Sequence, residues 1–311
     1  MNQYKIVIKI IIFFIILFLL NFCKNAAYKL SYRRELKENP VYCRIGEQWY
    51  QNNFSDEMRE IKLPENFEVL TILRSDENLK WIGIQGGEIK QLAELDIEEN
   101  SQKIIFTETQ LSEYGIKLDE VSQVQYQPEN EDISFVCKNV LYVFDRKSGV
   151  IKVLCEQILP HETYTKGYSY LWLNKSEFYY IDKDTHKINL YDCETKKGYS
   201  LEENAFELYE LSLEENNLLY MQIGQHEFMA YIVYGGIYIM KLDGESIKKK
   251  YEYYGGTDII NMHADTKGVI LKHPSKDNDS RSIFYFKRLM PLTPELKLED
   301  GDNSIQQILW P

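Results

Sequence analysis

The fold is decided by residues 178–201, which read FYYIDKDTHKINLYDCETKKGYSL. Short apolar runs at 178–181, 188–191 and 199–201 alternate in this stretch with clusters of Asp, Lys and Thr. Runs of this length between turn-forming residues are typical of β-strands, and an uninterrupted apolar run such as 178–181 is typical of a strand buried on both faces. The stretch therefore predicts antiparallel strands that are joined by tight turns.

This unit, an apolar strand ending in Asp, then a polar turn and another strand, recurs along the chain. Its Asp residues are Asp96, Asp145, Asp192 and Asp243, spaced by 49, 47 and 51 residues, and the series continues 44 residues later at Lys287. A second pair of apolar runs precedes each unit, as at 67–73 and 79–84. Four antiparallel strands in each repeat of this length are what a β-propeller blade needs.

Five complete repeats cover residues 66–298, and residues 28–65 and 305–310 remain. We expect the remaining segments to form a sixth blade closed by strands from both termini, which removes exposed sheet edges. In the repeat that contains Asp243, the first two strands are expected at 218–223 and 228–234. The sequence thus predicts an all-β fold, a β-propeller of six four-stranded blades. A pair of face-packed β-sheets is the alternative.

Two parts of the repeat resemble a known family. Residues 178–182 (FYYID), followed by 187–192 (KINLYD), and Leu242-Asp243-Gly244 resemble the repeats of six-bladed YWTD-type propellers and of the bacterial periplasmic propellers similar to them. The resemblance implies a propeller that binds proteins or small ligands, although some members are enzymes and the fold does not determine the function.

The N-terminus carries a targeting signal. Lys5 and Lys9 precede an uninterrupted apolar run at 10–20, and a basic region followed by such a run is typical of a secretory signal. Three outcomes are compatible with it: cleavage near Ala26-Ala27, a retained membrane anchor, or lipidation at Cys23, which follows Leu20 as in a bacterial lipobox. We therefore divide the chain into a signal or anchor (1–27) and a propeller domain (28–311). We expect the domain to be exported, to the periplasm, the outer face of the membrane or the extracellular space.

The charge of the chain excludes one class of partner. Its 36 Lys and Arg residues face 48 Asp and Glu residues, for a net charge of −12 at pH 7. Nucleic-acid binding depends largely on Lys and Arg that neutralise phosphates. We therefore expect no nucleic-acid partner.

The sequence contains no recognisable catalytic or metal-binding motif. The five His residues are isolated, and Cys43, Cys137, Cys155 and Cys193 have no zinc-ligand spacing, so we interpret these four as buried free thiols. Gly167 begins a segment that lacks the second glycine of a nucleophile elbow. We expect no metal, no cofactor and no catalytic residue.

The candidate binding residues lie in loops that a propeller would gather at one face. These loops join the second strand to the third, including 234–236 and 273–280, or join one blade to the next, including 157–167 and 253–257. Aromatic side chains with polar tips suit contacts with proteins, peptides or saccharides. The predicted ligand-binding residues are Tyr164, His161, His186, Tyr234, Tyr254 and His273.

We expect a non-catalytic binding module for a protein, peptide or glycan, with a membrane contact through the N-terminal segment if that segment is retained or lipidated. Two alternatives stay open. One is a propeller hydrolase or lyase acting on a glycan or peptide, which would need acidic or His side chains converging at one mouth of the channel. The other is an architectural subunit of an envelope complex, which would need an apolar patch on one outer rim.

Overall fold

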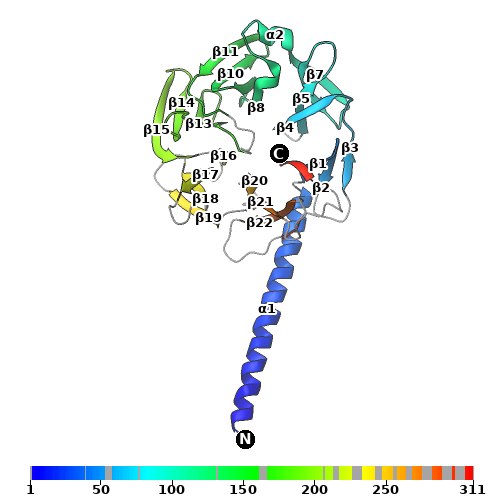
Figure 1. Cartoon of the computed structure of the whole chain (residues 1–311), viewed down its shortest axis with the longest axis vertical. Coiled ribbons are helices and arrows are strands. Elements are labelled where there is room, and N and C mark those ends of the chain that lie inside the picture. Colours follow the sequence, from blue (N-terminus) through cyan, green and yellow to red (C-terminus); the bar gives the residue numbers. More distant parts are fainter. Residues whose placement is uncertain are drawn as a thin grey trace.

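The structure is a computed structural model of the chain (Figure 1). It describes residues 2–38, 40–52, 58–75, 78–130, 132–160, 167–205, 207–212, 217–225, 233–241, 247–254, 258–263, 268–274, 282–288, 296–297 and 305–310. The described residues form a long N-terminal helix, α1 (Asn2–Glu38), followed by antiparallel β-sheets. A short helix, α2 (Glu108–Ser112), and one 3₁₀ turn, η1 (Leu118–Glu120), lie between two of the sheets.

The described strands form six antiparallel sheets of four strands each, here numbered in chain order. Sheet 1 contains β24 (Ile305–Leu309), β1 (Val41–Ile45), β2 (Gln48–Asn52) and β3 (Arg59–Ile61). Sheet 2 contains β4 (Phe67–Ser75), β5 (Asn78–Gln85), β6 (Gln91–Asp96) and β7 (Ser101–Thr107). Sheet 3 contains β8 (Val121–Tyr126), β9 (Ile133–Cys137), β10 (Val140–Asp145) and β11 (Val150–Cys155).

The other three sheets repeat this order of strands. Sheet 4 contains β12 (Tyr170–Trp172), β13 (Glu177–Ile181), β14 (Lys187–Asp192) and β15 (Lys197–Asn204). Sheet 5 contains β16 (Glu207–Ser212), β17 (Asn217–Gln225), β18 (Val233–Lys241) and β19 (Ile247–Tyr254). Sheet 6 contains β20 (Asp258–His263), β21 (Gly268–Pro274), β22 (Ser282–Arg288) and β23 (Leu296–Lys297).

The predicted four-stranded antiparallel repeat is confirmed, with one correction in sheet 5. The first strand there is Glu207–Ser212, and 217–225 is the second strand rather than the first. The predicted pairing of 218–223 with 228–234 is therefore wrong; part of that second segment lies outside the described residues. The sequence ELYELS of β16 is interrupted by two glutamates and lacks the continuous apolar run by which the other strands were found.

The sheets follow one another around a common centre, and their first strands lie toward it (Figure 1). Contacts join β4 to β8, β12 to β16, β16 to β20 and β20 to β24. Five of these first strands contain a register shift against the second strand, in β4, β8, β16, β20 and β24. A β-bulge of this kind bends a strand and increases its local twist, which suits strands that converge on one centre.

Strand β13 of sheet 4 is buried against two neighbouring sheets. In β13, Phe178 and Tyr180 pack with Val136 and Leu141 of sheet 3. The alternate residues, Tyr179 and Ile181, pack instead with Leu208 and Met240 of sheet 5. Successive side chains of a strand point to opposite faces, so the continuous apolar run of this strand supplies two separate interfaces, as predicted.

Sheets 3 and 4 are also joined by buried and partly buried hydrogen bonds. The Trp172 indole Nε1 donates to Ser134 Oγ at 2.8 Å, and the Tyr170 hydroxyl donates to the Gln123 carbonyl oxygen at 2.8 Å. The Gln123 side chain exchanges two hydrogen bonds with Ser169, at 2.7 and 3.0 Å. Gln123 lies in the bulge of β8 and has a φ of 52°, a left-handed conformation that is uncommon for residues other than glycine.

The repeated Asp residues have a structural role. Asp96, Asp145 and Asp192 each end the third strand of their sheet, as predicted, while Asp243 lies outside the described residues. In each case Oδ1 accepts the backbone N–H groups two and three residues later, at distances between 2.8 and 3.1 Å. These are Asx turns, and they fix the start of the hairpin that leads to the fourth strand.

The cysteines agree with the sequence analysis. Cys43, Cys137 and Cys155 are buried, Cys193 is partly buried, and all of them are free thiols. Burial is the main reason why the pKa values of Cys137 and Cys155 lie above the ordinary thiol value. These thiols are therefore poor nucleophiles.

We expect the Asp turn to contribute measurably to stability. Asp96→Ala removes the acceptor of two backbone N–H groups and of the Lys80 ammonium, and should lower the free energy of unfolding by about 1–3 kcal/mol. Asp96→Asn keeps an oxygen for the turn and should lose less. Glu98→Ala, at an exposed position of the same turn, is the control and should change little. Urea unfolding would contradict the role of Asp96 if Asp96→Ala were as stable as Glu98→Ala.

The same carboxylate predicts a pH dependence. The hydrogen bond from Lys80, followed by that from the Glu99 N–H, lowers the pKa of Asp96. An acid whose pKa is lowered by folding stabilises the fold above its unfolded pKa, about 3.9, and loses this effect as the pH falls through the folded pKa. The stability advantage of the wild type over Asp96→Asn should therefore stay constant above about pH 5 and shrink below about pH 4. Urea titrations between neutral and acidic pH measure this difference, and an advantage that is independent of pH would contradict it.

Candidate functional site

The predicted binding face corresponds to one end of the sheets, where second strands turn into third strands. In sheet 4 this turn spans residues 182–186, between β13 and β14. The Asp182 carboxylate caps it by accepting the N–H groups of Asp184 at 3.1 Å and Thr185 at 2.8 Å. The sequence Asp182-Lys183-Asp184 is thus part of a capped turn.

His186 closes this turn, and its side chain is partly buried. It has a φ of 56°, its N–H donates to the Asp182 carbonyl oxygen at 2.9 Å, and its own carbonyl oxygen accepts the Ala205 N–H at 2.9 Å. The second of these bonds joins the turn to the segment that enters β16. His186 is therefore held at the junction between sheets 4 and 5.

The chain that joins sheet 3 to sheet 4 is held at both ends beside this turn. At one end, Leu159 donates its N–H to Ile181 and Lys183 donates to Gln157, at 2.8 and 2.9 Å. At the other end, Tyr168 and Leu208 exchange backbone hydrogen bonds of 2.6 and 2.8 Å. His161 and Tyr164 occur in sequence between these two fixed ends and lie outside the described residues.

A buried acid, which the sequence analysis missed, lies at the second of these ends. Glu207 is only 5% exposed, and its Oε2 accepts the Gly167 N–H at 3.1 Å. A β-carbon on Gly167 would lie 2.7 Å from the Leu208 carbonyl oxygen and 2.8 Å from the Glu207 β-carbon, so the close approach requires glycine. The sequence signal was the single glycine before β12, which we considered only as part of a nucleophile elbow.

Tyr234 and Tyr254 are brought together by the structure, although not in a loop. Both lie in strands, and they are directly opposite each other in the pairing of β18 with β19. The predicted loop at 234–236 is wrong, because Tyr234, Gly235 and Gly236 are paired with residues of β17 and β19. Glycine permits a turn but does not require one, and pairing on both sides determines the conformation here.

His273, predicted to begin a loop, lies instead near the end of β21, opposite Ile283 of β22. Its strand belongs to sheet 6, whereas Tyr234 and Tyr254 belong to sheet 5 and His186 to sheet 4. The described candidates thus come from three consecutive sheets. Their grouping into one binding surface stays a prediction.

The side chains around the turn at 182–186 and the start of β16 can make polar contacts with a ligand. They include the partly buried imidazole of His186, the carboxylates of Asp182 and Glu207, and the Lys183 ammonium, which donates to the Glu156 carbonyl oxygen at 3.0 Å. Across the part of the chain that the structure describes, no three His, Cys, Asp or Glu side chains form a group able to hold a metal ion.

Comparisons with known proteins identify the class of fold. No family model matches the sequence, and no curated protein matches it. The structure is similar to a chain in the crystal structure of a nidogen/laminin complex, with a TM-score of 0.54 and 9% identity over 87% of this chain and 97% of that one. It is also similar to TolB from Acinetobacter baumannii, with a TM-score of 0.57 and 9% identity over 92% of this chain and 72% of that one. Both are β-propellers, and at this identity the likeness shows the fold alone: the chain has a fold of the β-propeller class.

Proposed function

We propose that the chain is an exported propeller that binds a protein, peptide or glycan partner without chemical turnover. The main support for this proposal is the way in which the segment that connects sheet 3 to sheet 4 is held. This segment is fixed at both ends by backbone hydrogen bonds, next to His186 and the buried Glu207, and it carries His161 and Tyr164 between those ends. A loop held on a rigid scaffold is a common location for binding residues.

The similar structures support this proposal by analogy of fold. One of them comes from a complex of nidogen with laminin, which is an assembly of two proteins. For the present chain we propose a binding surface formed by Tyr164, His161, His186, Tyr234, Tyr254 and His273. Tyrosine supplies a large contact area with a polar tip at a low cost in conformational entropy.

For location, we propose that residues 1–27 direct export and that residues 28–311 form the propeller. A helix long and apolar enough to cross a membrane, at Ile11–Arg34, supports the export part of this proposal, because both a signal sequence and a membrane anchor have this composition. The domain would then act outside the cytoplasm, in the periplasm, at the outer face of the cell membrane or in the extracellular space.

We also infer that the six sheets act as six blades and that strands from both termini close the ring. The support is that β24 pairs with β1 in sheet 1, where Cys43 lies opposite Ile308. Sheet 1 also has apolar contacts on both sides. Trp49 packs with Trp81 of sheet 2, and Ile308 belongs to the same buried cluster as Ile270 of sheet 6.

Closure by β24 predicts a large stability effect from one buried side chain. Ile308→Ala should lower the free energy of unfolding by about 2–4 kcal/mol, because it leaves a cavity between the first and last strands of the domain. Gln306→Ala, at an exposed position of the same strand, is the matched control and should be nearly neutral. Equal urea midpoints for the two variants would contradict closure by this strand.

The binding proposal is tested by combined substitution of Tyr164, Tyr234 and Tyr254 with Ala. If these side chains are anchors, the affinity for a partner found by cross-linking in native envelopes, or on glycan and peptide arrays, should fall by about 2–4 kcal/mol in total. The thermal midpoint should stay close to that of the wild type. A second variant, with His161, His186 and His273 replaced by Ala, tests the remaining predicted residues in the same assay.

The matched control is Tyr199→Ala, an exposed tyrosine on β15, the fourth and outermost strand of sheet 4. Its binding should equal that of the wild type. Full binding by the triple variant would eliminate the proposed surface. Steady cleavage of a glycan or peptide, abolished by one substitution of an Asp, Glu or His, would replace the binding module by an enzyme.

A further inference from the structure

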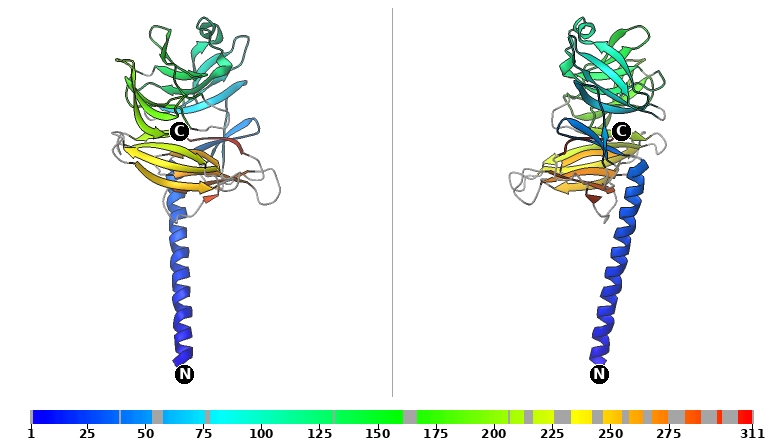
Figure 2. Two further views of the ribbon diagram at one scale, coloured as in Figure 1. Left: turned by 60° about the vertical axis from the view of Figure 1, so that its left-hand side comes forward. Right: turned by 90° about the vertical axis from the view of Figure 1, so that its right-hand side faces the viewer.

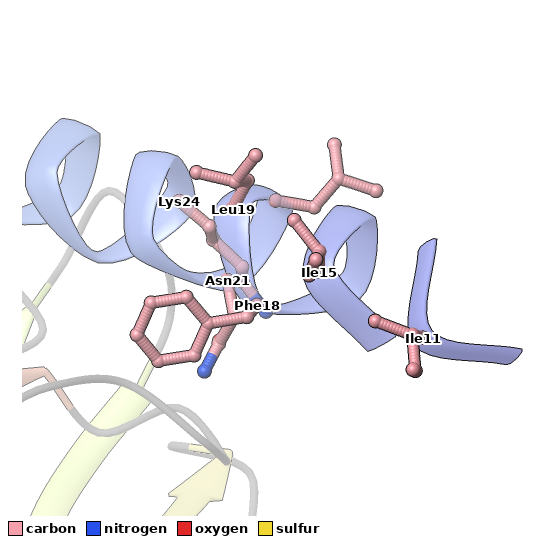
Figure 3. Close-up of a pocket in the computed structure, with 7 residues that line it drawn as sticks. Ile11, Ile15, Phe18, Leu19, Asn21 and Lys24 are labelled. Atoms are coloured by element: carbon pink, nitrogen blue, oxygen red, sulfur yellow. The ribbon is translucent and has the colours of Figure 1, made fainter. Parts of the chain in front are cut away.

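Helix α1 has two parts with different surroundings. In its first part, Ile11, Phe13, Ile15, Phe18, Leu20 and Phe22 are each more than half exposed, and at 100° per residue they lie on opposite faces of the helix. Figure 3 shows Ile11, Ile15, Phe18 and Leu19 projecting from successive turns, with Asn21 and Lys24 beyond them. A helix that is apolar all round is either buried in protein or surrounded by lipid, and this part is not buried within the chain.

The second part of α1 packs against the β domain through one face. Asn25 and Tyr28 are partly buried and Tyr32 is completely buried, while their neighbours, including Leu30, are exposed. Intervals of three and four residues place these side chains on one face. The Tyr32 ring meets Phe286 edge to face at a centroid distance of 5.0 Å, in the cluster that also contains Trp310 and Val41.

We propose that α1 is retained as a membrane-spanning anchor whose last turns are an integral part of the folded domain. The helix is continuous from Asn2 to Glu38, and it contains no Gly or Pro. The anchor and the docked part are therefore one rigid rod, which Figures 1 and 2 show extending from the sheets. This inference does not depend on the binding role.

The local sequence disfavours both cleavage near Ala26-Ala27 and lipidation at Cys23. A signal peptidase site requires small residues in an A-x-A-like pattern, and Asn25 occupies the first of these positions before Ala27. In the lipobox-like segment, bulky Phe22 occupies the position before Cys23 where a small residue is needed. Both sites lie within α1, directly before the face that docks on the domain.

The length and charge of the exposed part fit a lipid bilayer. Residues 6–22 are apolar except for Lys9 and Asn21, and at 1.5 Å per residue these 17 residues span about 26 Å, near the lower limit for a hydrocarbon core of about 30 Å. A long Lys side chain near the end of such a helix can extend to the interface. Residues 1–34 contain no acid, although the chain has 48 of them, so basic groups flank the apolar run on both sides.

The test uses the full-length chain expressed in a bacterium with a membrane-fractionation assay. A retained anchor predicts a chain whose mass includes residues 2–27, which stays in the membrane pellet after alkaline carbonate and is released only by detergent. Cys23→Ser should leave this behaviour unchanged, whereas Phe18→Asp should move most of the chain to the soluble fraction. A chain that begins at Tyr28, or one that Cys23→Ser releases, would overturn the proposal.

The docked part is tested by a matched pair of variants on the same helix. In detergent-solubilised full-length chain, Tyr32→Ala should lower the thermal midpoint of the β domain by roughly 5–10 °C, because a buried ring is lost. Leu30→Ala, 68% exposed and two residues away, should leave the midpoint unchanged. Equal midpoints for the two variants would show that α1 is not part of the folded domain and would overturn that half of the inference.

A protease-accessibility experiment tests the proposed export separately from the retained anchor. Two basic residues, Lys5 and Lys9, precede the apolar run, and five follow it within α1: Lys24, Lys29, Arg33, Arg34 and Lys37. An excess on the domain side is typical of a domain left in the cytoplasm, whereas a basic region before an apolar run is typical of export. Digestion of the β domain in cells with a permeabilised outer layer supports export. If the β domain resists the protease until the inner membrane is lysed, the proposed export is wrong. The carbonate assay still tests the retained anchor in that case.

Discussion

The described sheets depend on burial against neighbouring sheets. A strand such as β13 has no polar face: its four residues from Phe178 to Ile181 are all at most 6% exposed, and they contact sheet 3 and sheet 5 alternately. A single four-stranded sheet with two apolar faces would be insoluble by itself. The sheets can therefore be stable only as a set, and the stability of each interface contributes to the stability of the two sheets beside it.

The parts of the fold that follow from local sequence could be predicted. Asp96, Asp145 and Asp192 end third strands because their side-chain oxygen accepts two backbone N–H groups of the next turn, and this interaction depends on a few neighbouring residues. The continuous apolar strands were found for a similar reason. Strand β16 was missed because Glu207 and Glu210 interrupt its apolar residues. Glu207 is buried in this strand because it accepts a hydrogen bond from the Gly167 N–H, and this contact is forty residues away in the sequence.

The candidate site could be predicted only in outline. His186 was correctly expected in a turn, but its position depends on Asp182 and Ala205, and the second of these contacts requires the arrangement of two sheets. Tyr234 and Tyr254 were expected in loops, whereas the register of β18 and β19 makes them opposite partners within strands. Strand bulges, such as the one that contains Gln123, have no sequence signature of their own, because they arise where inner strands must bend to fit their neighbours.

The pairing of β24 with β1 has a consequence for biosynthesis. Tyr42 lies opposite Leu309, so β1 acquires this partner only after the strands of sheets 2 to 6 have been translated. Until then the edge of β1 is unpaired, and an unpaired edge can recruit strands of other chains. This edge of β1 must therefore stay unpaired while sheets 2 to 6 are made, which makes the nascent chain a suitable client for chaperones that shield strand edges.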